Sequence, residues 1–191
     1  MPSHRTGIVH LDLIIFDCDG VLADSEVISS RVLIDELAEE GVSVDADYVR
    51  RNFLGRSFPT VARTIRETLG HPLPSDFEMR YRTALLARFE HDLRPTTGLL
   101  PMLGALALPA CVATSSSLER VTRTLALMGI AAHFGDRVFT ASMVARGKPS
   151  PDLFLFAASR MGARPCRTLV IEDSLPGLLA ARAAGMRPLA Y

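Results

Sequence analysis

The sequence has 191 residues, and its 21 acidic and 21 basic side chains give a formal net charge of zero. This length suffices for one well-packed core, or for one core domain with a smaller attachment. A nucleic-acid-binding protein usually carries a basic excess, which is missing here, and a hydrophobic content of 48% excludes a disordered chain.

The sequence favours a cytoplasmic protein without a membrane partner. Its three cysteines, Cys18, Cys111 and Cys166, are far apart and form no CxxC pair, which is typical of reduced thiols. The longest apolar stretch, residues 99–113, is too short for a membrane span and contains two prolines. The first residues lack the apolar segment and cleavage site of a signal peptide.

The first predicted strand is unusually apolar and is followed by helices. Residues 13–16 are Leu-Ile-Ile-Phe without alternation, which predicts a central parallel strand covered on both faces. From about residue 25 to 94 the pattern is helical. Helix periodicity or helix start and stop residues occur in "SEVISSRVLIDELAEEG", "FPTVARTIRETLG" and "SDFEMRYRTALLARFEHDL".

Beyond "RPTTG" (94–98), strands and helices alternate. The predicted strands are "PACVAT", "RVFT", "TLVIED" and "RPLAY", and the helices between them are "SLERVTRTLALMG", "SPDLFLFAASRMG" and "SLPGLLAARAAG". Ser116 and Glu119 predict a capping box at the start of the first of these helices. Alternation of this kind indicates an α/β fold with a parallel, Rossmann-like sheet. We therefore expect a core domain of residues 1–24 and 95–191, with a helical cap domain, residues 25–94, inserted after the first strand.

Polar residues gather where the predicted strands end, and this edge is where open α/β sheets bind ligands. They are Asp17, Asp19, Thr114, Ser115, Glu172 and Asp173, with Lys148 in a nearby loop. Carboxylates packed this closely require a bound cation or a raised pKa on one of the acids. An all-oxygen ligand set favours Mg²⁺ over zinc, and Lys148 adds positive charge that can face phosphoryl oxygens. The edge therefore has the chemistry of a phosphate site.

Four motifs carry a family resemblance. "DCDGV", the strand end at Thr114, "GKPSPD" and "IEDSLPG" follow the order and spacing of the motifs of haloacid dehalogenase-like phosphohydrolases, and the sequence resembles that superfamily. The helical insertion lies between the first and second motifs. It resembles the cap of the subfamily that contains β-phosphoglucomutase and small phosphosugar phosphatases, and "FDCDGVLADSE" looks most like bacterial 6-phosphogluconate and sugar-phosphate phosphatases.

The resemblance implies a role for each motif residue. Asp17 would attack phosphorus to form an aspartyl-phosphate, and Asp19 would protonate the leaving oxygen and then activate water. Lys148 and Thr114 would stabilise charge on the transferring group, and Ser115 would add hydrogen bonds. The implied Mg²⁺ ligands are Asp17, the backbone carbonyl of Asp19, Glu172 (directly or through water) and Asp173. Without the resemblance, the two acids at residues 172 and 173 could simply cap a helix.

The cap loop "FLGRSF" (53–58) allows two interpretations. Gly55 and Arg56 could belong to an ordinary turn between helices that carries a surface arginine. Alternatively, Arg56 reaches the pocket and grips a substrate anion, which the resemblance favours because related caps place a basic residue in this loop.

We expect a Mg²⁺-dependent phosphatase that hydrolyses a small phosphorylated metabolite, a sugar phosphate or sugar-acid phosphate. The alternatives are a phosphosugar mutase and a non-catalytic metabolite-binding domain. Within the family that the sequence resembles, mutases carry a histidine at the position of Ser29, so the serine argues against a mutase. True dehalogenases lack the second aspartate of the first motif, so Asp19 argues against dehalogenation. Phosphonate-cleaving relatives need a lysine in the cap, and residues 25–94 contain none. Nothing in the sequence marks a dimer surface, so a monomer is expected. Relatives usually continue beyond "MRPLAY" with another strand and helix, so either the sequence is short or the sheet edge is finished differently.

Overall fold

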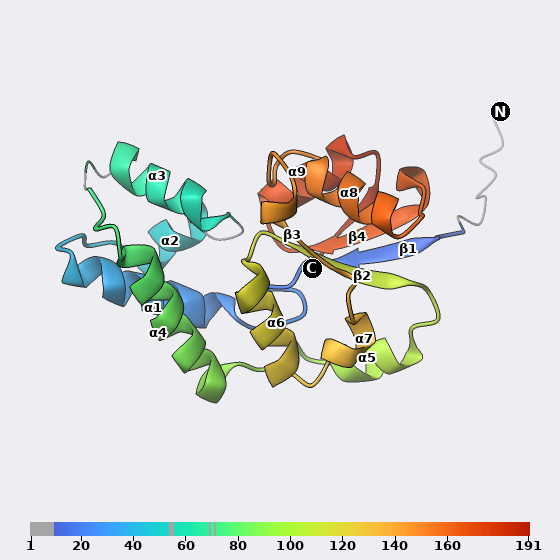
Figure 1. Ribbon diagram of the computed structural model, residues 1–191, viewed down its shortest axis with the longest axis horizontal. Helices are drawn as coiled ribbons and strands as arrows, with labels where there is room; N and C mark the ends of the chain where they lie inside the picture. Colours follow the sequence, from blue (N-terminus) through green and yellow to red (C-terminus); the bar gives the residue numbers. More distant parts are fainter. Residues whose placement is uncertain (1–9, 54–55, 69, 71) are drawn as a thin grey trace, which may run out of the picture.

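The structure is a computed structural model that describes residues 10–53, 56–68, 70 and 72–191 (Figure 1). Within these ranges the strands are β1 (Leu13–Phe16), β2 (Ala110–Thr114), β3 (Val138–Thr140), β4 (Thr168–Glu172) and β5 (Arg187–Ala190). The helices are α1 (Glu26–Glu39), α2 (Ala46–Asn52), α3 (Phe58–Thr68), α4 (Phe77–Asp92), α5 (Leu99–Ala105), α6 (Leu118–Leu127), α7 (Ala131–Phe134), α8 (Asp152–Arg160) and α9 (Leu175–Ala183). Short 3₁₀ helices lie at Ala141–Met143 and Pro165–Arg167.

The described strands form one parallel sheet in the order β3-β2-β1-β4-β5, so β1 lies at its centre. Ile15 is aligned with Cys111 of β2 on one side and with Val170 of β4 on the other. All four β1 residues are buried, as the unbroken apolar run predicts for a strand covered on both faces. The predicted α/β class is confirmed.

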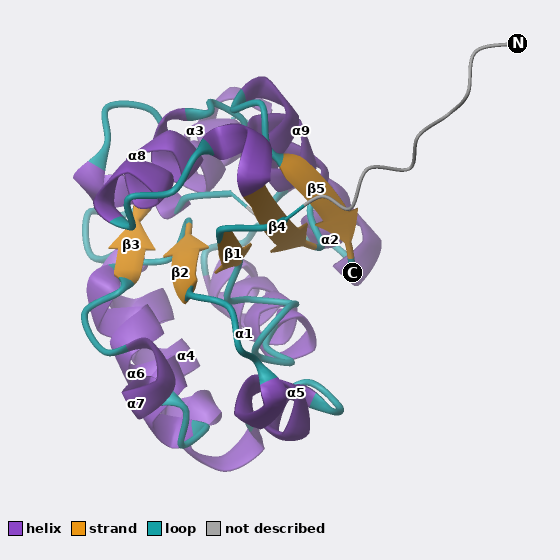
Figure 2. Cartoon of the chain, turned by 90° about the vertical axis from the view of Figure 1, so that its right-hand side faces the viewer, coloured by secondary structure: helices purple, strands orange, loops and turns teal. Residues whose placement is uncertain are grey.

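Helices cover both faces of this sheet (Figure 2). Ile14 and Phe16 point to the face covered by α5, α6 and α7, where the ring of Phe16 meets Phe134 edge to face. Leu13 and Ile15 point to the opposite face and pack against α8 and α9. Because successive side chains of a strand point to opposite faces, this four-residue strand contributes side chains to two separate apolar clusters.

Helices α1 to α4 lie together at one end of the sheet, between β1 and β2 in chain order (Figure 1). The chain leaves the core and returns to it at one place. The Asp24 amide donates to the Arg94 carbonyl at 2.9 Å, and the Thr96 amide donates to the Leu22 carbonyl at 3.0 Å. This geometry suits an inserted unit, which we call the helical insertion; the exact division after residues 24 and 94 stays a prediction.

Two short helices lie where the sequence predicts none, α5 with seven residues and α7 with four. Segments this short have little intrinsic helicity, and packing against the sheet stabilises them. Leu99 and Leu103 of α5 and Phe134 of α7 are buried in the cluster on that face. No described helix is long and apolar enough to cross a lipid bilayer.

Truncation of the central strand tests this packing. Ile15 is 0% exposed, so Ile15→Ala should lower the free energy of unfolding by about 2–5 kcal/mol through lost burial and the cavity left behind. Leu175→Ala, at a residue 68% exposed, should change it by less than about 0.5 kcal/mol. Urea unfolding measures both, and equal effects would contradict the assignment of β1 as the core strand.

Candidate active site

Three carboxylates meet at the ends of two neighbouring strands. Asp17 follows β1, Glu172 ends β4, and Asp173 comes next. Each offers one oxygen, and these oxygens lie within 4.8 Å of one another. The cause is the parallel register, since Phe16 is aligned with Ile171, and the residues that follow reach the same edge of the sheet.

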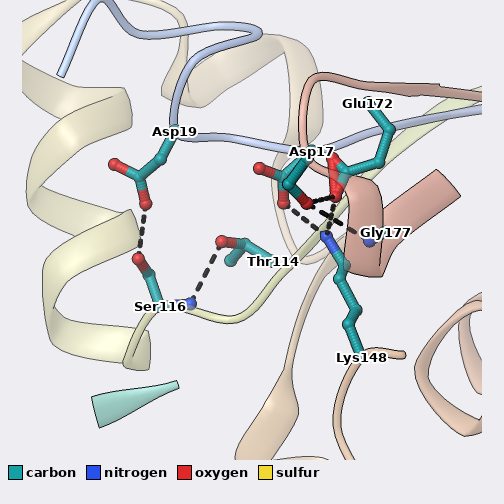
Figure 3. A network of polar contacts seen from close by, with 8 residues as sticks. Asp17, Asp19, Thr114, Ser116, Lys148, Glu172 and Gly177 are labelled. Carbon is teal, nitrogen blue, oxygen red and sulfur yellow. Dashed lines mark hydrogen bonds and ion pairs between the residues drawn. The ribbon is translucent and has the colours of Figure 1, made fainter. Parts of the chain in front are cut away.

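Lys148 supplies the positive charge in this cluster (Figure 3). Its Nζ lies 2.6 Å from Oδ1 of Asp17 and 3.2 Å from Oε1 of Glu172. The side chain is 1% exposed and Nζ lies 5.0 Å from the centre of the Phe154 ring. Burial alone would lower the pKa of Lys148, but the charges of Asp17 and Glu172 outweigh it and raise this pKa. The amine is therefore charged.

The carboxylates have an excess of negative charge. Burial, followed by repulsion from Glu172, raises the pKa of Asp17 to about 7, although Lys148 opposes this. Burial, followed by the charges of Asp17 and Glu172, raises the pKa of Asp173 to about 8. One amine does not balance three acids at this distance, so the site favours a further cation.

The donor set fits a hard divalent cation. Oε1 of Glu172 accepts from Lys148 and from the Ser174 hydroxyl at 2.7 Å, whereas its buried Oε2 has no hydrogen-bond partner among the described residues. An unpartnered buried carboxylate oxygen is costly unless a ligand satisfies it. Carboxylate oxygens of Glu172, Asp17 and Asp173, one from each, lie together, and such an all-oxygen set suits Mg²⁺ or Ca²⁺.

Two glycines make room for these carboxylates. Gly20 has φ +79°, and a Cβ there would overlap the carboxylate of Asp173. Gly177, in the first turn of α9, lies so close to Glu172 that a Cβ would overlap its carboxylate (Figure 3). The glycines of "DCDGV" and "SLPG" thus permit the close approach of the acids.

Asp19 lies apart from the three-acid cluster and points away from Asp17 (Figure 3). Its Oδ1 accepts from the Ser25 hydroxyl at 2.5 Å and from Nη2 of Arg120 at 2.7 Å, and its Oδ2 accepts from the Ser116 hydroxyl at 2.5 Å. Burial alone would raise the pKa of Asp19, but Arg120 and the two hydroxyls outweigh it and lower this pKa. Asp19 is therefore held as an ionised carboxylate.

The remaining predicted residues line the same cavity. Thr114 is buried at the end of β2, and its hydroxyl accepts from the Ser116 amide at 3.1 Å. Ser115 is half-buried beside it, and both contribute to the cavity wall together with Asp17 and Asp19. Thr114 thus shapes the loop that carries Ser116.

The cap loop is placed in part. Arg56 is exposed and lies on the wall of the cavity that contains Asp17 and Asp173. Gly55 lies outside the described residues. The position of Arg56 is compatible with contact to a ligand.

The three residues that donate hydrogen bonds to Asp19 were not predicted as part of the site: Ser25, Ser116 and Arg120. The sequence assigns Ser116 to a helix cap, which is wrong: Ser117 is the cap of α6, accepting from the Arg120 amide at 3.3 Å, and the Ser116 hydroxyl binds Asp19 instead. Arg120 reads as a polar residue of an amphipathic helix. The one available signal was its place in the first turn of a helix that starts beside a strand end.

Comparisons with known proteins assign the chain to a family. Residues 11–185 match the sequence profile of the haloacid dehalogenase-like hydrolases. 6-phosphogluconate phosphatase of Escherichia coli (strain K12) is 28% identical over 177 residues, which cover 92% of this chain and 80% of that protein. Fructose-1-phosphate phosphatase YqaB of the same organism is 31% identical over 181 residues, covering 91% and 92%.

A solved structure has the same fold as this chain. CbbY from Rhodobacter sphaeroides, crystallised in complex with phosphate, superposes with a TM-score of 0.81 at 28% identity, covering 93% of this chain and 84% of that one. The profile match extends over the first strand, the helical insertion and the sheet through α9. This chain therefore belongs to the haloacid dehalogenase-like hydrolases.

Proposed function

We propose that the protein is a Mg²⁺-dependent phosphatase that hydrolyses a small phosphorylated metabolite through an aspartyl-phosphate on Asp17. The observation that carries this proposal is the buried amine of Lys148, 2.6 Å from Asp17 and 3.2 Å from Glu172, with Asp173 in the same cluster. The family supplies the reaction class. Two relatives are named as phosphatases of 6-phosphogluconate and fructose 1-phosphate, which supports a sugar phosphate or sugar-acid phosphate as substrate.

Asp17 is the nucleophile, because it directly follows the buried central strand β1 and lines the cavity. The charged amine of Lys148 holds this carboxylate and stabilises the negative charge of the transferring group, with the Thr114 hydroxyl nearby. A Mg²⁺ ion held by Asp17, the Asp19 backbone carbonyl, Glu172 and Asp173 supplies, when bound, further positive charge for the phosphoryl oxygens.

Asp19 is the general acid and base: its protonated form gives its proton to the leaving oxygen, and the resulting carboxylate then takes the proton of the attacking water. Ser115, Gly55 and Arg56 bind the substrate. The helical insertion, residues 25–94, acts as a cap domain that excludes bulk water and selects the organic part of the substrate. The cytoplasmic location and the monomeric state expected from the sequence stay predictions.

A screen of phosphorylated metabolites tests the proposed function. With Mg²⁺ present, we expect release of inorganic phosphate from sugar phosphates or sugar-acid phosphates. Isomerisation of a sugar phosphate without phosphate release would instead identify the mutase alternative. No reaction with any phosphate ester, including p-nitrophenyl phosphate, would favour a binding domain.

Substitution of the nucleophile gives a sharper prediction. Asp17→Asn keeps the shape of the side chain but removes its charge, so kcat should fall by at least about 10³-fold. The variant should still fold, as circular dichroism would show. Activity within tenfold of the wild type would contradict the assignment of Asp17.

Removal of one acid should separate metal binding from folding. For the wild type, Mg²⁺ at about 100 times its Kd should raise Tm by roughly 5–10 °C, because binding stabilises only the folded state. Asp173→Asn should lose most of this shift, yet be at least as stable as the wild type in EDTA because a repulsion is relieved. Differential scanning fluorimetry measures both effects. Asp47→Asn, at an exposed side chain, is the matched control and should keep the full Mg²⁺ shift.

Gly20→Ala should impair the same cation site without changing any of its acids, since the Cβ of the new alanine would displace the Asp173 carboxylate. Gly129→Ala is the control, because Gly129 also has positive φ (+70°) but has no atom within 4 Å of an added Cβ. Both variants should lose about 1–2 kcal/mol of stability from the backbone conformation. The Mg²⁺-induced Tm shift should disappear in Gly20→Ala alone; its persistence there would refute the role of Asp173.

A further inference from the structure

Arg120 connects the acid/base residue to the helical insertion. Its side chain is 17% exposed, and Nη2 donates both to Oδ1 of Asp19 at 2.7 Å and to the Ser29 hydroxyl of α1 at 2.9 Å. The guanidinium lies over the ring of Phe89 of α4, with 5.3 Å between its central carbon and the ring centre. The guanidinium of Arg120, which belongs to α6 of the core, thus contacts the loop after β1 as well as α1 and α4 of the insertion.

The pairing of Arg120 with Asp19 is hard to replace. Among the described residues, Asp19 is the one carboxylate within ion-pair distance of Arg120. A buried guanidinium without a counter-ion is costly, so this contact fixes both side chains. The Phe89 ring and Ser29 then determine where the guanidinium lies, and hence where the carboxylate of Asp19 is held.

The donors also occupy both oxygens of the Asp19 carboxylate. Two hydroxyls and a guanidinium N–H donate to its two oxygens, so the carboxylate is an acceptor at both ends. A carboxylate in this form can take a proton from water. Uptake of a proton from water belongs to the second half of the reaction, in which the aspartyl-phosphate is hydrolysed.

We propose that Arg120 is a positioning residue that holds the Asp19 carboxylate where it accepts the proton of the hydrolytic water. This inference rests on the proposed phosphatase function. In the step concerned, the water oxygen bonds to phosphorus and the bond between phosphorus and the Asp17 oxygen breaks. One water proton passes to Asp19, and inorganic phosphate leaves.

The kinetics of Arg120→Gln with p-nitrophenyl phosphate test this role. Nitrophenolate leaves without being protonated, so kcat/KM, which reports the attack by Asp17, should change by less than about threefold. Hydrolysis of the intermediate should slow, and kcat should fall by about tenfold or more. A burst of nitrophenolate, close to one per enzyme, should then precede the steady state, and intact-protein mass spectrometry should detect the phosphorylated enzyme.

Two further variants keep the test decisive. Arg123→Gln, one turn along α6, removes another contact with α4, the exposed ion pair of Arg123 with Glu90, and should leave kcat unchanged without a burst. Ser116→Ala removes a smaller donor to Asp19 and should show the same split between kcat and kcat/KM with a smaller loss. It serves the same purpose if Arg120→Gln does not fold.

A parallel fall of kcat and kcat/KM in Arg120→Gln and Ser116→Ala, without accumulation of phosphoenzyme, would overturn the positioning role. The same holds if Arg123→Gln reproduces their effect, since Arg120 would then act only by docking the insertion. A wild-type protein that hydrolyses no phosphate ester would instead contradict the proposed function, and this inference with it.

Discussion

The site depends on the balance between one buried amine and three carboxylates. Lys148 contacts Asp17 and Glu172, and Asp173 completes the cluster. When all three acids are ionised, the amine leaves two negative charges uncompensated, which corresponds to one divalent cation. The positions of the acids follow from the sheet, because β1 and β4 are parallel neighbours that end at the same edge. The nearby glycines allow them to come this close.

Two aspartates of one motif experience opposite environments. Burial and the neighbouring acids raise the pKa of Asp17, whereas Arg120 and the hydroxyl donors outweigh burial and lower the pKa of Asp19. Environments that separate the pKa values of neighbouring acids are typical of sites where such groups have different chemical tasks. The separation arises because the turn after β1 directs the two side chains to opposite sides (Figure 3). One points toward the Lys148 loop and the other toward α6 and the helical insertion.

Much of this could be predicted from the sequence, because it depends on local signals. The apolar run before Asp17, the alternation of strands and helices, and the residues at the strand ends are each readable from a few neighbours in the chain. The contacts of Ser116 and Arg120 with Asp19 are not, since they join residues 97 and 101 positions apart. A serine next to a helix start fits the capping pattern in the sequence whether or not its hydroxyl caps the helix. Here the N-cap of α6 is Ser117, one residue after the predicted Ser116. Tertiary packing, which decides such cases, also explains the short helices α5 and α7.

The most direct test is a crystal structure with Mg²⁺ and beryllium trifluoride, a mimic of a phosphoryl group bound to a carboxylate. The expected result is beryllium on the Asp17 carboxylate, with Lys148 at the fluorides and the cation bound by Asp17 and Asp173. A cation bound elsewhere, or an adduct absent from Asp17 at saturating reagent, would contradict the central claim that these acids and this amine form one phosphoryl-transfer site.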